Sequence, residues 1–171
     1  MRITLVLALI IMACGAAGNA TSSPQGDPPP TAPHEQLATL ERTVCFGTCP
    51  DYKVTIFRDG IVEYQGEKFV KIVGRATGRL TRRQLAQLEE LFRRNGYLGL
   101  ESSYERVDAT DLPSAFTSYS PASGETKAIR HYQGDRSAPE ALTRVEQGID
   151  RIVNIEQWIG TPEERQHVPR T

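Results

Sequence analysis

Apolar and polar residues alternate through the middle of the chain, which is the pattern of strands that bury one face. An Asp-Gly pair at 59–60 separates two alternating segments and is a strong hairpin signal, because both turn residues need positive φ. A second hairpin is expected around Ser123-Gly124. The predicted strands are 37–44, 52–57, 61–64, a segment over 69–73 that can extend past Gly74 towards Leu80, 117–119 and 128–132.

Two further segments place their apolar residues at helical spacing. The first begins at Thr81-Arg82-Arg83-Gln84, which matches a capping box, and stops at Asn95-Gly96. The second begins with a cap at Ser137-Ala138-Pro139-Glu140. Their apolar faces are Leu85, Leu88, Leu91 and Phe92 in the first, and Leu142, Val145, Ile149, Ile152 and Val153 in the second. The pattern predicts a single α+β domain of antiparallel meander and hairpins with two packed helices.

The N-terminal pattern is different, because residues 3–12 are nearly all apolar. This run is about half of the ~20 residues that cross a bilayer, so it is typical of the core of a signal peptide. The sequence Ile11-Met12-Ala13-Cys14 resembles a bacterial lipobox. That resemblance implies a signal peptide over 1–13, cleavage before Cys14 and a lipid on Cys14. Two or three acyl chains would anchor the protein durably.

The lipobox implies an exported, membrane-anchored protein that faces the periplasm or lies at the cell surface. Since residue 15 is Gly and not Asp, the usual sorting of such lipoproteins favours the outer membrane where one exists. The alternative is an ordinary secretory signal that is cut after Ala17 or Ala20 and releases a soluble protein.

Composition divides the rest of the chain. Residues 14–36 contain five prolines and no aromatic residue, so they are predicted to be a flexible tether. The folded domain is expected over 37–159, and the polar residues 160–171 are expected to be a loose tail. A net charge of −1 gives no reason to expect binding to nucleic acid.

The chain has three cysteines. With Cys14 assigned to the lipid, Cys45 and Cys49 form an even pair in an exported protein, where a disulfide is the usual state. A redox pair and a metal site are the alternatives. A thioredoxin-like centre needs two intervening residues and a helix N-terminus, whereas this pair has three and lies among predicted strands. A metal site would need further ligands.

A run of residues around the cysteines resembles a known bacterial family. The signature Cys-Phe-Gly-x-Cys-Pro at 45–50 is its most specific part. The other matching parts are 41–44, 51–56, Asp59-Gly60, 110–113, the hairpin at Lys127 and the helix that ends at Trp158. The chain is similar over about 37–159 to the uncharacterised domain of unknown function 6438. Since that family has no established activity, the resemblance supports the domain limits and implies no chemistry.

Residues with catalytic or metal-binding potential are sparse. His131 is the histidine within the predicted fold, at the end of a strand and without a nucleophile motif beside it. We therefore expect it to be a hydrogen-bonded or exposed strand residue. An acidic stretch could bind a cation or be a solvated loop, but it lacks the calcium-loop pattern. It contains Glu101, Glu105, Asp108 and Asp111. We predict no catalytic residue, no metal site and no cofactor.

Basic residues are concentrated between 68 and 94 and could form a patch for an anionic partner or an ordinary solvated face. The candidate patch is Lys68, Lys71, Arg75, Arg79, Arg82 and Arg83. We expect a lipid-anchored envelope protein whose domain binds a protein, lipid or glycan partner, or supports the envelope, without catalysis. The alternative is a hydrolase or thiol-redox accessory that uses His131 or Cys45 and Cys49. Convergence of His131, the acidic stretch and the cysteines in one pocket would favour the enzyme.

Overall fold

A computed structural model describes residues 34–106 and 111–166. The predicted signal peptide, Cys14, nearly all of the tether and Asp108 lie outside the described residues, as does the end of the predicted tail.

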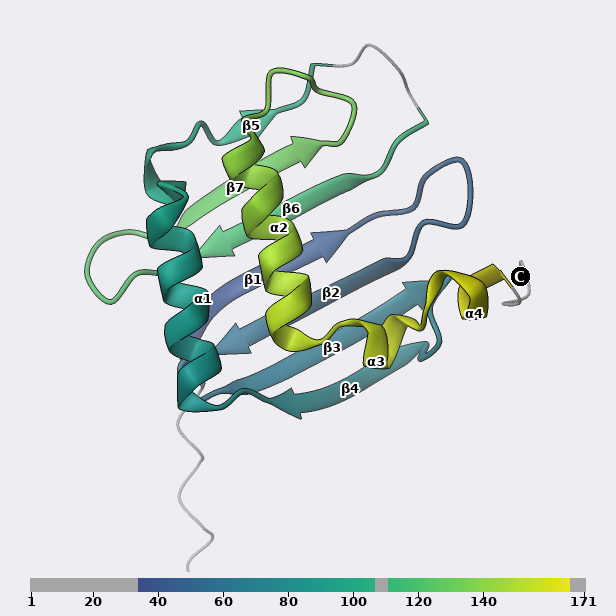
Figure 1. Ribbon diagram of the computed structural model, residues 1–171, viewed down its shortest axis with the longest axis horizontal. Coiled ribbons are helices and arrows are strands. Elements are labelled where there is room, and N and C mark those ends of the chain that lie inside the picture. Colours follow the sequence, from purple (N-terminus) through teal and green to yellow (C-terminus); the bar gives the residue numbers. More distant parts are fainter. Residues whose placement is uncertain (1–33, 107–110, 167–171) are drawn as a thin grey trace, which may run out of the picture. The chain divides into compact units, whose positions relative to one another are not determined.

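The described residues belong to one unit built on a seven-stranded sheet with the order β4-β3-β2-β1-β6-β7-β5 (Figure 1). Neighbouring strands are antiparallel except β5 and β7, which are parallel. The strands are β1 (Gln36–Arg42), β2 (Asp51–Phe57), β3 (Ile61–Lys68), β4 (Gly74–Arg79), β5 (Ser103–Tyr104), β6 (Ser114–Tyr119) and β7 (Lys127–Tyr132). The predicted α+β class and the antiparallel meander are confirmed.

Helices cover one face of the sheet and leave the other open (Figure 1). They are α1 (Arg82–Arg94), the 3₁₀ turn η1 (Tyr97–Gly99), α2 (Glu140–Val153), α3 (Glu156–Ile159) and α4 (Pro162–Gln166). The short helix α4 lies within the segment that was predicted to be a loose tail. Among the described residues, no helix is long and apolar enough to span a membrane.

The alternating pattern has the expected structural basis. In β2, Tyr52, Val54 and Ile56 are buried beneath the helices, and the residues between them are on the open face. The α1 capping box is present, because Thr81 and Gln84 each accept a bond from the other's backbone N–H. The predicted cap of α2 is wrong: Pro139 is the N-cap and has no side-chain bond, and Ser137 donates its hydroxyl to Asp135 instead.

The strand predicted over 69–73 is wrong, because these residues form a turn, but its extension past Gly74 towards Leu80 is confirmed by β4 at 74–79. Phe69 has a positive φ of 52°, and the backbone N–H groups of Lys71 and Ile72 bond the C=O groups of Ile159 and Trp158. The backbone of this turn is thus held by the C-terminal helices, with Val70 buried in the core and Val73 67% exposed. In β4 the helix-facing positions are small, and the Trp158 ring lies against one of them, Gly78.

Candidate functional site

The cysteine pair lies in the loop between β1 and β2. The Cys45 and Cys49 sulfurs are at disulfide distance, 1.95 Å, as predicted. The loop is tied to the acidic stretch, because the Phe46 N–H donates to the Asp111 C=O at 3.1 Å. The ring of Phe46 is 90% exposed, a feature that the sequence pattern did not single out. No helix begins at this loop, so the redox reading gains no support from its position.

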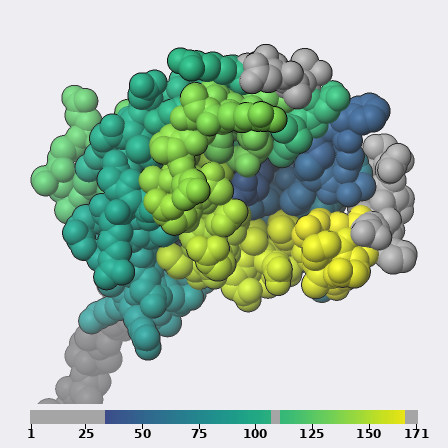
Figure 2. Space-filling model, turned by 45° about the horizontal axis from the view of Figure 1, so that its top comes forward, coloured from purple at the N-terminus to yellow at the C-terminus, as the bar shows by residue number. Residues whose placement is uncertain are grey.

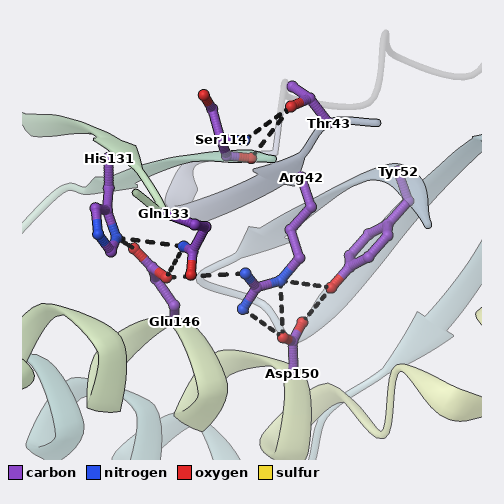
Figure 3. Close-up of polar contacts among 8 residues, drawn as sticks. All are labelled: Arg42, Thr43, Tyr52, Ser114, His131, Gln133, Glu146 and Asp150. Carbon is purple, nitrogen blue, oxygen red and sulfur yellow. Dashed lines mark hydrogen bonds and ion pairs between the residues drawn. The ribbon is translucent and has the colours of Figure 1, made fainter. Parts of the chain in front are cut away.

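Six polar side chains from four elements and one loop form a buried polar cluster beneath α2 (Figure 3). Its members are Arg42, Tyr52, His131, Gln133, Glu146 and Asp150.

One half of the cluster joins β1 and β2 to α2. The Asp150 carboxylate accepts from Arg42 Nη2 at 2.8 Å and from the Tyr52 hydroxyl at 2.6 Å. Arg42 Nε also donates to the Tyr52 oxygen at 3.1 Å. Burial and the Asp150 carboxylate raise the pKa of Tyr52, so the phenol stays protonated as a donor. Burial lowers the pKa of Arg42, but Asp150, Tyr52 and Glu146 together more than offset this and raise it, so the guanidinium stays charged.

The other half joins β7 to α2. His131 Nδ1 and Glu146 Oε1 lie 2.6 Å apart, and the side chains are 5% and 1% exposed. The second Glu146 oxygen accepts from Gln133 Nε2 at 3.0 Å and lies 3.8 Å from Arg42 Nη1. The cluster therefore holds two carboxylates, one guanidinium and one imidazole in mutual contact.

The arrangement satisfies its own hydrogen-bonding groups. In the described part of the chain, every buried side-chain nitrogen and oxygen has a partner. Figure 2 shows a recess between α2 and the C-terminal helices, with the β1–β2 region in blue at its floor. Arg42 and Asp150 come from elements that border this recess and keep 20% and 18% exposure, while His131 lies deeper. The cluster is thus built as an interior brace between sheet and helix.

Among the described residues, His131, the cysteine pair and the acidic stretch are not brought together at one site. The cysteine loop and the acidic stretch touch, but His131 is buried against Glu146 on the helix side of the sheet. Glu105 pairs with Arg130 at 3.1 Å. Within the described ranges, no group of three His, Cys, Asp or Glu side chains could hold a metal ion.

The six candidate basic residues are all exposed and lie in or near β4, the strand at one edge of the sheet. Lys68 ends β3, Lys71 lies in the following turn, Arg75 and Arg79 are in β4, and Arg82 and Arg83 begin α1. We call these six residues the basic strip. Lys71 pairs with Glu164 at 3.2 Å, and Arg79 donates to the Asp59 C=O. Burial raises the pKa of Asp51, and the charge of Lys68 opposes this rise. A bond from the Ile61 N–H lowers the pKa of Asp59, and the charge of Arg79 adds to this lowering.

Sequence reasoning named His131 but missed its partners. Arg42 was detectable because it follows Ala38 and Leu40 at the inward positions of β1. Glu146 and Asp150 were detectable because they continue the four-residue spacing from Leu142 on the apolar face of α2. A charge at an inward position is a signal for a buried polar network.

No curated protein matches this chain. The model of the family described as a domain of unknown function (DUF6438) matches residues 36–153, a range that contains all six residues of the buried polar cluster. The chain therefore belongs to the DUF6438 family.

Proposed function

We propose that this chain is a lipid-anchored protein of the bacterial cell envelope, and that its folded domain binds an anionic partner and catalyses no reaction. The proposal has two parts, the anchor and the binding surface, and each has its own test.

The anchor part rests on Ile11-Met12-Ala13-Cys14 and the proline-rich segment behind it. Lipidation of Cys14 would hold the domain close to the envelope membrane, in the outer membrane where one exists. Radiolabelled palmitate should enter the wild type but not Cys14→Ser. A Cys45→Ser/Cys49→Ser variant, which keeps Cys14, is the control and should label like the wild type. Equal labelling of Cys14→Ser would contradict the anchor.

The binding part is carried by the basic strip. Two of its six exposed cations, Arg75 and Arg79, lie in the edge strand β4, and the other four lie in β3, α1 and the turn before β4; one close acidic side chain, Glu164, is among the contacts described above. Such a line of charge attracts an anionic surface with little need for precise positioning, and the attraction falls as salt increases. Catalysis would require positioned acid–base or nucleophilic groups, and His131 is engaged with Glu146 inside the fold.

The test is binding of full-length protein in non-ionic detergent to polyglutamate and to vesicles that contain anionic phospholipid. Arg79→Gln/Arg82→Gln/Arg83→Gln should weaken binding at least tenfold at about 10 mM salt, and less at about 150 mM, where screening is stronger. The matched control is Arg93→Gln/Arg94→Gln/Arg144→Gln, which removes the same charge from exposed sites elsewhere. Equal loss in both variants would refute the strip as the binding surface.

His131 separates binding from catalysis. A His131→Ala variant that is still folded at the assay temperature should bind the anionic probes like the wild type. If folded His131→Ala loses the wild-type activity in cells while the variant of the basic strip keeps it, the hydrolase alternative is supported. Rapid turnover of the Cys45–Cys49 disulfide by thiol-exchange enzymes would support the thiol-redox alternative.

A further inference from the structure

The two edges of the sheet differ in how they are closed. At one edge, β5 is only two residues long. At the other, β4 has six residues and pairs with β3 alone. Among the described residues, none pairs with the outer side of β4, which forms the lower margin of the sheet in Figure 1. The backbone N–H and C=O groups of every second β4 residue therefore face outward.

The side chains of β4 are suited to a neighbouring strand. Arg75, Thr77 and Arg79 are exposed on the open face of the sheet. The alternate positions are small, and a Cβ on Gly78 would lie 2.9 Å from Trp158 Cζ2. Trp158 thus lies against the helix side of β4 at Gly78.

We propose that the free edge of β4 takes an extended acidic segment of a partner protein as an additional strand. This inference rests on the proposed binding function and adds the mode of binding and the class of partner. Main-chain bonds along the edge would supply affinity, and side chains on alternate positions would supply specificity. Arg75 and Arg79 are four residues apart on one face, so their cross-strand partners would be two acidic residues with the same spacing.

A second copy of this chain fits the edge less well than an acidic segment. If two β4 strands pair antiparallel about Thr77 with the same faces aligned, Arg75 of one copy lies opposite Arg79 of the other. Like charges directly opposite one another destabilise a strand pair.

A flat anionic membrane also fits less well. Glu63 on β3 is directly beside Thr77 on β4, and Glu63 and Glu67 are exposed. A membrane laid against the open face would meet these carboxylates together with the arginines. A strand added at the edge would meet β4 first and would use its outward backbone groups, which lipid headgroups do not require.

The experiment uses full-length protein and the short peptide Val-Glu-Val-Thr-Val-Glu-Val, labelled for fluorescence anisotropy. Two isomers carry three N-methyl groups each, one on the two Glu residues and the Thr, and the other on the Val residues at the third, fifth and seventh positions of the peptide. Each isomer blocks hydrogen bonding along one edge of the peptide and keeps both charges. A peptide with Lys in place of Glu controls for charge.

Strand addition predicts that the parent peptide and one N-methyl isomer bind, and that the other isomer binds at least tenfold more weakly. Arg75→Gln/Arg79→Gln should weaken binding at least tenfold, whereas Arg93→Gln/Arg94→Gln should not. Amides of residues 74–79 should gain protection from hydrogen exchange when the peptide binds.

Three results would overturn the inference, and they differ in what they say about the proposed function. Equal binding of both isomers would leave charge-driven binding intact and refute strand addition. Binding of anionic vesicles without binding of the acidic peptide would assign the strip to a membrane surface. Failure of every anionic probe would refute both the strand addition and the proposed binding function.

Discussion

The pairing of His131 with Glu146 predicts a large and non-additive effect of mutation on stability. His131→Ala would leave the Glu146 carboxylate, 1% exposed, with Gln133 and a guanidinium nitrogen 3.8 Å away. Removing one partner of a buried hydrogen bond to a charged group leaves that group unsatisfied and costs about 1.5–3 kcal/mol. We expect about 2–3 kcal/mol for His131→Ala and a similar loss for Glu146→Ala.

The double variant should lose much less than the sum of the two single losses, because it leaves no unpaired charge inside the protein. We expect a coupling energy of about 2 kcal/mol from a double-mutant cycle measured by urea unfolding at neutral pH. Arg130 and Glu105 provide a matched control. Arg130 is next to His131 in β7, and this pair is exposed by 62% and 43% at a distance of 3.1 Å. Its coupling should be about 0.5 kcal/mol or less. A His131–Glu146 coupling no larger than that of the control would refute the bracing role.

Three further predictions concern the fold. Gly78→Ala should lower the free energy of unfolding by about 1–3 kcal/mol, because the new Cβ meets the Trp158 ring. The control Thr77→Ala, on the open face, should change it by less than about 0.5 kcal/mol. Equal effects of the two substitutions would contradict the packing of Trp158 on β4. Cys45→Ser/Cys49→Ser should lower the free energy of unfolding, measured by chemical denaturation, by roughly 2 kcal/mol, the value for so short a loop. The wild type in reductant should be as stable as this variant. Two free thiols in protein isolated from the envelope would refute the disulfide. Bonds from the Ser137 hydroxyl and the Arg106 N–H lower the pKa of Asp135, so its stabilising effect is present above the ordinary Asp pKa and is lost as pH falls through the lowered value. Asp135→Asn should therefore be less stable than wild type at pH 7, and the difference should shrink in acid; a difference that grows in acid would contradict the assignment.

The elements that could be predicted from sequence are those whose signals are local. The hairpin at Asp59-Gly60 and the capping box of α1 each depend on residues close together in the chain, and both are present. The segment 69–73 misled the prediction, because its backbone N–H groups bond C=O groups of α3, a contact across more than 80 residues. β4 gave no alternating signal, since Trp158 fills the space that larger side chains would otherwise take.

The buried polar cluster could be predicted only in part: charged residues at inward positions of β1 and α2 are visible in the sequence, but which side chains they pair with is not. Arg42, His131 and Asp150 are far apart in sequence and meet only when β1, β7 and α2 pack together. The basic strip was predicted as a set of residues, but its course along a free sheet edge required the strand order, and that order depends on long-range pairing.

The most direct test of binding along β4 is a photo-crosslinking amino acid at Thr77 in the full-length protein in intact cells. The account predicts a discrete protein adduct from position 77 that disappears with Arg75→Gln/Arg79→Gln, and no such adduct from position 140, where Glu140 is highly exposed at the start of α2. An adduct from position 77 that persists after the arginines are neutralised, or one that forms only from position 140, would contradict it.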